Sequence, residues 1–319
     1  MRYFLTGGTG FIGGELARQL RSAGHDVIAL VRSPARAGRL VEMGADLTEG
    51  DLQDPDSLRE GMKGCDGVFH LAAWYEVGTD PRNARAINVD GTRNVLEAMR
   101  DLNIAKGVYT SSLAVNSDTG GRVVDEDYVH RGPHLSVYDQ TKWEAHHSVA
   151  APMIDEGLPL VITMPGIVYG PSDTSMLGGI MRDAVRGNLV TLPGPPTGGC
   201  WAHVEDTARG HVLAMERAAA GSTYMLCGPA HTYQEAFRVA AQAAGVKLRA
   251  AFLPPAALRT MAPIVDAVGR VLPVPAKLSG EAMRVTGGTT YYGDSSRAQR
   301  DLGFSPRPLR EGMVQTFSL

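Results

Sequence analysis

A short apolar run near the amino terminus breaks into glycines and then continues as a helical pattern. This order predicts a strand, a tight turn and a helix that begins at Phe11. Glycines let the backbone approach a pyrophosphate, and a helix N-terminus offers it free N–H groups. The run opens a plausible βαβ unit, so it favours a dinucleotide site over a glycine-rich turn without a ligand. The residues expected to contact the cofactor here are Gly7, Thr9, Gly10, Phe11, Ile12 and Gly13.

Apolar strand patterns alternate with helical patterns as far as residue 164. The expected strands are Tyr3–Thr6, Val27–Val31, Ala45–Glu49, Gly67–Leu71, Gly107–Ser111 and Leu160–Met164. The expected helices between them are Phe11–Ser22, Pro55–Gly61, Ala84–Leu102 and Leu135–Glu156. This alternation predicts an α/β fold with a doubly wound parallel Rossmann sheet and helices on both faces.

After Pro165 the pattern changes to loops rich in Pro, Gly and Ser between further helices. These helices are expected at Met176–Arg186, Asp206–Ala219 and Thr232–Ala244. Trp201–Val204 has the pattern of a strand entering a helix, and we expect it to return to the main sheet. We therefore expect residues 1–164, with 201–219, to form the cofactor domain. Residues 165–319 should mainly form a smaller, mostly helical substrate lobe.

Composition excludes several classes of partner. The chain has 319 residues and a net charge of −3, with scattered basic residues, so no nucleic-acid partner is expected. Its three cysteines are too few and too far apart for a disulfide framework or a zinc ribbon, which favours a reducing, cytoplasmic setting. His146 and His147 are adjacent and point to different helix faces, so no metal site is expected.

No apolar run reaches the roughly 18 residues that a membrane span requires. The first strand begins at residue 2, so no signal peptide is expected to precede it. The most apolar late stretch, Ala262–Ala276, is interrupted by Asp266, Arg270 and several prolines. We interpret it as a pocket wall, and no membrane partner is expected.

The end of the second strand indicates which cofactor is bound. In dinucleotide-binding units, an acidic residue about 20 residues beyond the glycines holds the ribose hydroxyls. Here Val27–Val31 is followed by Arg32 and Ser33, with no carboxylate. Because an arginine can grip the 2′-phosphate, Arg32 favours NADP(H) over NAD(H), the alternative being a solvated arginine. After the third strand, Asp51 and Leu52 are placed to meet the adenine, although Asp51 could equally cap its loop.

Tyr138 and Lys142 are four residues apart, which on a helix places them on one face, one turn apart. A phenol has a pKa of about 10, and a neighbouring positive charge favours the phenolate. Lys142 and a bound cationic nicotinamide could supply that charge together. Alone, the pair is also compatible with an ordinary surface helix.

Several motifs, in order, resemble an extended short-chain dehydrogenase/reductase of the NAD-dependent epimerase/dehydratase family. They are the runs 6–13, 70–73, 88–96, 109–112, Tyr138 with Lys142, 165–171, 203–206 and 301–306. The strand end Val31–Pro34 and the late Pro-rich apolar stretch are similar to the dihydroflavonol-reductase-like branch.

The resemblance implies a role for Tyr138 as the general acid/base and for Lys142 as its partner on the nicotinamide ribose. It implies that Ser112 donates to the substrate oxygen, with Ser111 as the competing hydroxyl. It also implies cofactor contacts at Leu71, Ala72, Ala73, Pro165, Ile167 and Val168. Tyr75 and Trp201 are candidate substrate contacts, with packing as the alternative for Trp201. The substrate pocket is expected to include the loop from Tyr75 to Arg82.

Two departures from the nucleotide-sugar enzymes disfavour a diphosphate-bearing substrate. The run from Thr197 to Ala202 carries no charge, and Met164 stands where such enzymes often have an arginine. The sequence thus predicts an NADP(H)-dependent oxidoreductase that reduces a ketone or aldehyde, or oxidises a secondary alcohol. The alternatives are a sugar epimerase that retains its cofactor and, more remotely, an NADP-binding sensor. By resemblance we also expect a homodimer through the helices 84–102 and 135–156.

Overall fold

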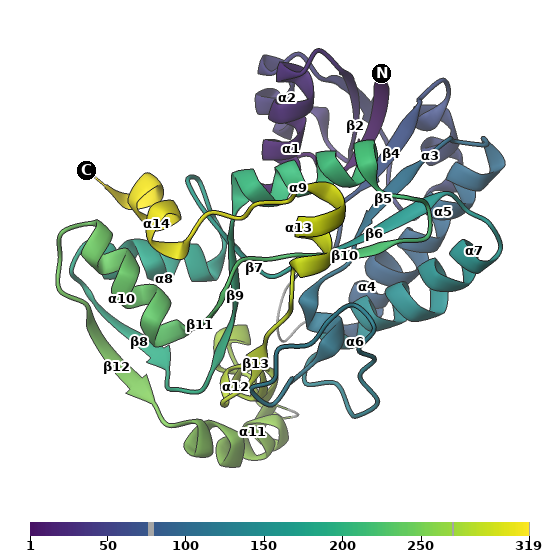
Figure 1. The fold of residues 1–319 in the computed structure, drawn as a ribbon. Coiled ribbons are helices and arrows are strands. Elements are labelled where there is room, and N and C mark those ends of the chain that lie inside the picture. Colours follow the sequence, from purple (N-terminus) through teal and green to yellow (C-terminus); the bar gives the residue numbers. More distant parts are fainter. Residues whose placement is uncertain (76–79, 270, 319) are drawn as a thin grey trace.

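A seven-stranded parallel sheet forms the centre of the protein (Figure 1). The structure is a computed structural model that describes residues 1–75, 80–269 and 271–318, so Arg270 and part of the expected pocket loop, 76–79, lie outside the described residues. The strand order is β10-β6-β5-β4-β1-β2-β3. The bounds are β1 Arg2–Thr6, β2 Asp26–Val31, β3 Asp46–Glu49, β4 Gly67–His70, β5 Gly107–Thr110, β6 Leu160–Pro165 and β10 Thr223–Leu226.

Helices cover both faces of this sheet, because its strands are apolar on both sides. One apolar cluster packs α3, α5 and α7 on the first face, and another packs α1, α9 and α13 on the second. The bounds are α1 Phe11–Ser22, α2 Gly38–Glu42, α3 Pro55–Met62, α4 Pro81–Arg85, α5 Gly91–Asp101, α6 Val137–Glu144, α7 Ala151–Asp155, α9 Val204–Arg217 and α13 Ser296–Leu302. The doubly wound α/β fold expected from the alternation is confirmed.

Two of the expected long helices contain a wider turn in their middle. Between α4 and α5 the chain forms the π-helical segment η2, Ala86–Asp90, and between α6 and α7 it forms η4, Ala145–Ala150. Such segments are rare and frequently mark functional positions. Short 3₁₀ turns complete the connections: η1 Pro34–Arg36, η3 Leu113–Asn116 and η5 Ala276–Leu278.

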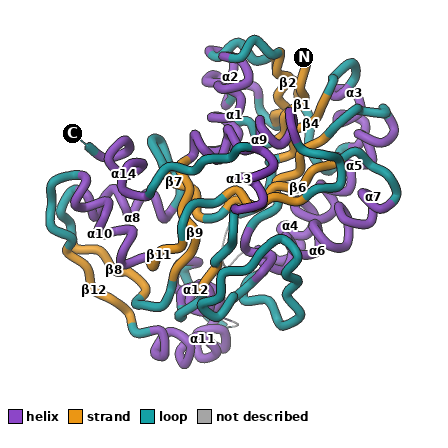
Figure 2. Tube along the Cα trace, viewed as in Figure 1, coloured by secondary structure: helices purple, strands orange, loops and turns teal. Residues whose placement is uncertain are grey.

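The C-terminal residues build a second lobe beside the carboxyl ends of the central strands (Figure 2). It contains a small sheet of β11, β9 and β13, with β7 on β9, and a two-stranded sheet of β8 and β12. The bounds are β7 Ile167–Tyr169, α8 Met176–Val185, β8 Leu189–Pro193, β9 Gly198–His203, β11 Ala230–Thr232, α10 Tyr233–Ala243, β12 Arg249–Leu253, α11 Pro255–Gly269, α12 Gly280–Thr286, β13 Thr290–Tyr291 and α14 Leu309–Phe317.

The strand expected at Trp201–Val204 does not join the main sheet. Residues 201–203 belong to β9, which pairs with β7, β11 and β13 in the second lobe. The strand that extends the main sheet is β10, which pairs with β6. The helix that follows β9, α9, does pack against the main sheet. The chain therefore returns to the Rossmann domain through a helix and a later strand.

Trp201 is a central packing residue of the second lobe. It is 1% exposed, lies between the rings of Tyr169 and Tyr233, and donates its indole N–H to the His231 carbonyl at 3.2 Å. The structure thus supports the packing role, which the sequence left open beside a contact with substrate.

We expect Trp201→Ala to lower the free energy of unfolding by about 3–5 kcal/mol, because it leaves a cavity in a closed apolar cluster. Urea unfolding measures the change. Leu189→Ala is the control, since Leu189 is 67% exposed and its truncation should stay within about 0.5 kcal/mol. Equal losses in the two variants would contradict the packing role.

Candidate active site

The glycine loop turns sharply against the strand beside it. Gly7 has a φ of +75°, and a Cβ there would lie 2.6 Å from the amide nitrogen of Ala72. A Cβ at Gly13 would lie 2.2 Å from the carbonyl oxygen of Gly7. Both distances are well below contact, so only glycine fits at either position. The turn between β1 and α1 therefore exposes its backbone, with no side chain at these two positions.

The N-terminus of α1 is available to an anion. Its N-cap residue, Gly10, provides no side-chain cap, and no acidic residue lies in the first turn. The first N–H groups, including those of Phe11 and Ile12, can therefore donate to an anion, and the positive end of the helix dipole attracts it. This end lies between β1 and β4, where the strand order reverses, which is where doubly wound sheets bind ligands. These residues fit the pyrophosphate of a dinucleotide.

The expected adenosine end lies beyond β2 and β3. Arg32 is exposed at the end of β2 and makes no ion pair with any acidic residue in the described ranges. One carboxylate oxygen of Asp51 accepts the Gln53 N–H at 2.9 Å, so the loop-capping role is present. Leu52 is buried against Gly91, where an added Cβ would lie 2.9 Å from that of Leu52.

The other expected cofactor residues lie at the same edge of the sheet. Leu71, Ala72 and Ala73 directly follow β4, and Pro165 is the last residue of β6. Ile167 and Val168 are half-buried in β7. The strand ends therefore bring these predicted residues to one edge.

Lys142 of α6 is held by two hydrogen bonds. Its ammonium donates to the Thr110 carbonyl at 2.7 Å and to the Tyr109 hydroxyl at 3.2 Å. The side chain is 2% exposed, and burial lowers its pKa to about 7. No carboxylate among the described residues pairs with it, so the charge depends on dipoles alone.

Tyr138 lies one turn before Lys142, beside Ser112 and Tyr75. Burial raises the pKa of Tyr138, while a hydrogen bond with the Ser112 hydroxyl opposes that rise. The Tyr75 ring meets the Tyr138 ring edge-on at 5.0 Å and is 67% exposed. Ser111, by contrast, is buried and hydrogen-bonds to His146 Nδ1 at 2.9 Å. The geometry therefore brings Ser112, and not Ser111, to the phenol.

A buried polar network that sequence reasoning did not identify connects β1 and β4 to the helix after β4. Thr92 donates to the Asn88 carbonyl at 2.7 Å, so its oxygen accepts from His70 Nε2 at 3.0 Å. His70 Nδ1 then accepts from the Thr6 hydroxyl at 2.7 Å. Burial lowers the pKa of His70 to about 3, so the ring is neutral. The motif around His70 was visible in the sequence, but its partners are not adjacent in the chain.

A second unpredicted group of polar residues joins the second lobe to α6. Asp139, the residue after Tyr138, accepts from Ser136 at 2.6 Å and from the Tyr291 hydroxyl at 3.0 Å. Burial raises the pKa of Asp139 to about 7. Glu281 accepts the Val137 N–H at 2.9 Å. The start of α6 is thus fastened to α12 and β13, a contact for which the sequence carried no signal.

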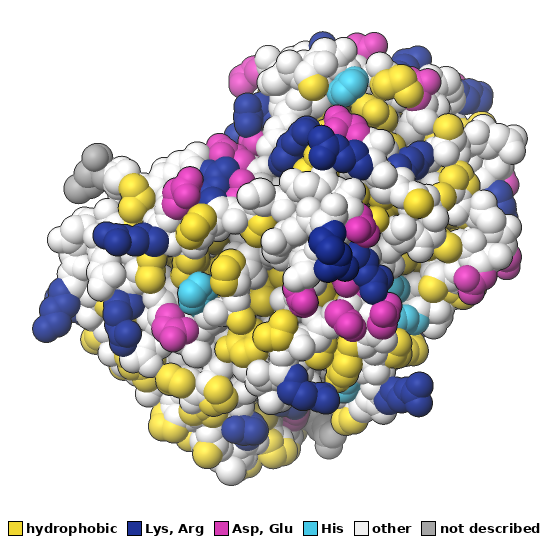
Figure 3. Space-filling view, viewed as in Figure 1, with side chains coloured by type: hydrophobic (Ala, Val, Ile, Leu, Met, Phe, Trp, Pro, Cys, Tyr) yellow, Lys and Arg dark blue, Asp and Glu magenta, His cyan; other side chains and the backbone are white. Residues whose placement is uncertain are grey.

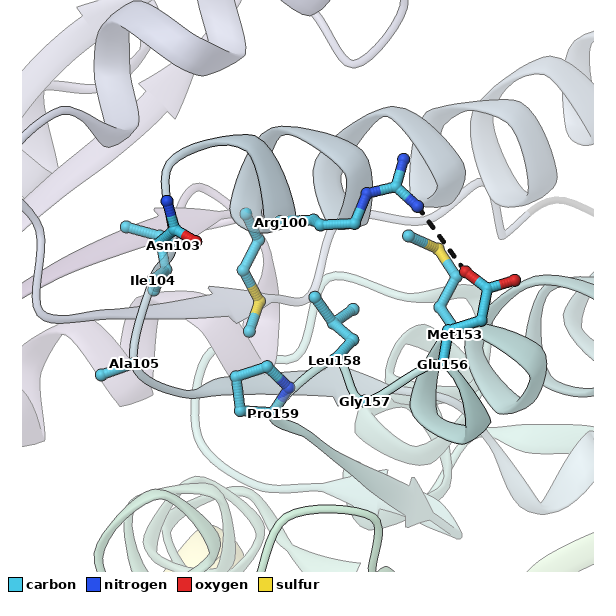
Figure 4. Close-up of a pocket in the computed structure, with 10 residues that line it drawn as sticks. Arg100, Asn103, Ile104, Ala105, Met153, Glu156, Gly157, Leu158 and Pro159 are labelled. Carbon is cyan, nitrogen blue, oxygen red and sulfur yellow. Dashed lines mark ion pairs between the residues drawn. The ribbon is translucent and has the colours of Figure 1, made fainter.

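A cavity of about 350 Å³ lies at the opposite edge of the sheet (Figure 4). Its walls come from the end of α5 and the loops that precede β5 and β6, and an Arg100–Glu156 ion pair of 3.7 Å spans its rim. Because these residues precede the strands, the cavity is separated from Tyr138 by the length of the sheet. It is not part of the candidate site.

The described residues lack the features of a metal site and of a membrane-spanning helix. No cluster of three or more His, Cys, Asp or Glu side chains there could hold a metal ion. No helix there is long and apolar enough to cross a membrane.

Comparison with known proteins decides the family. Residues 3–227 match the NAD dependent epimerase/dehydratase family. The chain belongs to this family. The expected family is therefore confirmed, and with it a nucleotide-binding oxidoreductase and epimerase superfamily whose members use a nicotinamide cofactor.

Relatives with reductase names support the dihydroflavonol-reductase-like branch. A Synechocystis sp. protein that bears the name of a dihydroflavonol 4-reductase is 37% identical over 220 residues, which cover 67% of this chain and 63% of that protein. The chain thus spans less than two thirds of that relative's length. The 4-hydroxy-2-methyl-3-oxo-4-farnesyl-3,4-dihydroquinoline-1-oxide ketoreductase of Stigmatella aurantiaca is 31% identical, covering 96% of this chain and 92% of its own.

Two solved structures superpose on the chain over nearly its whole length. The crystal structure of gox2253 is 31% identical with a TM-score of 0.85, covering 98% of this chain and 96% of its own. MoeE5 in complex with UDP-glucuronic acid and NAD is 26% identical with a TM-score of 0.78, covering 99% and 98%.

The buried ammonium of Lys142 generates a prediction about stability. Its pKa is lowered to about 7 in the folded protein, so the unfolded chain binds more protons between about pH 7 and 10.5. The contribution of Lys142 to the free energy of unfolding therefore rises with pH through that window. Relative to Lys142→Met, the parent should gain up to about 1.4 kcal/mol of unfolding free energy per pH unit. Urea unfolding between about pH 6.5 and 8.5 measures this. Parallel pH profiles would contradict it.

Proposed function

We propose that this protein is an NADP(H)-dependent oxidoreductase that reduces a ketone or aldehyde, or oxidises the corresponding secondary alcohol. The observation that carries the proposal is that Tyr138 lies beside the Ser112 hydroxyl, one helical turn before Lys142, whose ammonium is fixed on the Thr110 carbonyl. Residues 1–164, with α9, would hold the cofactor, and most of the other residues of 165–319 the substrate.

Tyr138 is proposed as the proton donor in the direction of reduction. Its environment keeps the phenol protonated, which is the form that can protonate a carbonyl oxygen. Ser112 donates a hydrogen bond to the same oxygen and stabilises the charge that develops there. When bound, the nicotinamide supplies or accepts the hydride.

Lys142 is proposed to position the cofactor and to tune the phenol. Its ammonium has three donors, and the Thr110 carbonyl and Tyr109 hydroxyl occupy two of them. The remaining donor is free to reach a ribose hydroxyl. A positive charge in this position also favours the phenolate when Tyr138 acts as a base.

The proposed substrate is a small to medium carbonyl compound without a diphosphate. The uncharged run Thr197–Ala202 is buried in the structure, so it offers no cation to a phosphate. Tyr75 and Tyr138 present aromatic surface instead. Relatives named as a ketoreductase and as a 2-alkyl-3-oxoalkanoate reductase support this class.

NADP(H) is the proposed cofactor, on the strength of the unpaired, exposed Arg32 at the end of β2. The complex of MoeE5 with UDP-glucuronic acid and NAD supports a second candidate, a sugar epimerase that retains its cofactor. Nicotinamide that co-purifies tightly and shows no net turnover would favour it. Tight NADPH binding without turnover across a wide carbonyl panel would favour a sensor.

We further propose a homodimer formed by the helices of 81–101 and 137–155. The Arg85–Glu144 ion pair already joins these two helices within one protomer. A cytoplasmic setting is supported by the three cysteines, which are all free and buried.

Tyr138→Phe should lower kcat/KM for carbonyl reduction by at least a hundredfold, because the general acid is lost. NADPH affinity, measured by fluorescence titration, should stay within twofold. Tyr3→Phe is the control, since Tyr3 lies at the start of β1, at the edge of the sheet opposite to Tyr138. A Tyr138→Phe protein that keeps its turnover within tenfold of the parent would refute the assignment.

Arg32→Asp should shift the ratio of kcat/KM for NADPH over NADH toward NADH by at least tenfold, because it replaces a phosphate-binding cation by a carboxylate. Steady-state kinetics with each cofactor measures the ratio. Arg310→Asp makes the same charge change at an exposed position on α14 and should leave it unchanged. An unchanged ratio in Arg32→Asp would remove the support for NADP(H).

A further inference from the structure

Helix α11 carries apolar side chains on its exposed side as well as on its buried side, and its polar residues are Arg259, Thr260 and Asp266. Leu258 and Ala262 are buried on the side that packs against α12. Met261, Ile264 and Val268 recur at helical spacing on the other side and are exposed. The apolar residues of a surface helix normally face the core, so the exposed apolar side of α11 lacks its cover.

The uncovered face continues on both sides of the helix. Val271 is 83% exposed and Leu272 is 60% exposed, directly after α11. Together the exposed apolar residues form what we call the α11 face: Phe252, Leu253, Met261, Ile264, Val268, Val271, Leu272 and Leu278. Figure 3 shows hydrophobic side chains gathered at the lower end of the protein, where Figure 1 places α11. An uncovered apolar patch of this kind marks an interaction site.

Positive charge accompanies the α11 face. Residues 246–278 contain five basic residues and one acidic residue, a net charge of +4 in a chain whose total is −3. Lys247, Arg249 and Arg259 are exposed, and none of them pairs with an acidic side chain in the described ranges. These three exposed charges are therefore not neutralised by an ion pair among the described residues.

We propose that the α11 face docks on a membrane surface that contains anionic phospholipids. With 15 residues, α11 is shorter than the roughly 20 that span a bilayer, so it would lie in the plane of the headgroups. Its apolar side chains enter the acyl boundary while the basic residues meet the phosphates. A second copy fits less well, because a two-fold contact would bring two positive faces together.

This proposal departs from the expectation that the late apolar stretch is a pocket wall without a membrane partner. That expectation treated the stretch as an amphipathic region whose apolar residues face a pocket. The structure covers only the side that faces α12.

The α11 face is one helix away from the catalytic helix. α12 packs on α11, and its Glu281 accepts the N–H of Val137, the residue before Tyr138. Arg284 of α12 also donates to the Leu135 carbonyl at 3.3 Å. Docking here would suit a carbonyl substrate dissolved in the bilayer, a consequence that rests on the proposed function. The docking itself does not depend on it.

Vesicle co-sedimentation tests the docking. The parent protein should sediment with vesicles of phosphatidylglycerol and phosphatidylcholine in equal amounts. The double variant Ile264→Asp, Val271→Asp should lower the partition coefficient at least tenfold, because carboxylates oppose both insertion and anionic lipid. Val41→Asp is the matched control, since Val41 is 56% exposed on α2 and should bind as the parent does.

The proposal is overturned if the parent does not sediment with the anionic vesicles, or if the Val41→Asp variant loses as much binding as the double variant. It is also overturned if vesicle binding is absent and the particle mass, measured by light scattering without lipid, is half as large in the double variant as in the parent. That result would assign the α11 face to a second copy. Circular dichroism verifies that each variant is folded, and none of these measurements requires the enzyme to be active.

Discussion

The close approach of Gly7 to the backbone of Ala72 is the contact on which the candidate site depends. A Cβ at Gly7 would lie 2.6 Å from the Ala72 nitrogen, so β1 and β4 can meet at this point only if the turn is bare. The helices that follow these two strands pack on opposite faces of the sheet. The crevice between them is where an uncapped helix N-terminus and the strand ends converge. Thr6, which bonds to both His70 and Ala72, holds this arrangement.

Lys142 and Tyr138 are both partly or fully buried without a charged partner, and this sets their protonation. Desolvation lowers the pKa of Lys142 and raises that of Tyr138, so each group is biased toward its neutral form. The Ser112 hydroxyl and the Thr110 carbonyl oppose this bias with dipoles. A site in this condition is sensitive to any cation that enters it, because a nearby positive charge favours the phenolate.

Local patterns in the sequence were sufficient where the interactions are local. The helix Phe11–Ser22 has the predicted bounds, because its glycine turn and apolar spacing lie within one segment. The predicted strands of the first 164 residues are all present in the main sheet, with ends that differ by one residue. The strand at Trp201–Val204 was correctly expected as a strand but wrongly placed, since its partners β7, β11 and β13 are distant in the chain.

The glycine turn and the spacing of Tyr138 and Lys142 depend on neighbours within a few residues, so sequence patterns were sufficient to predict both. The three-dimensional fold determines that Ser112 and not Ser111 meets Tyr138, and that Trp201 is buried. It also decided that Tyr291 and Glu281 fasten the start of α6, and that one side of α11 is left uncovered. These features arise from contacts between distant segments, for which hydrophobic periodicity carries no information.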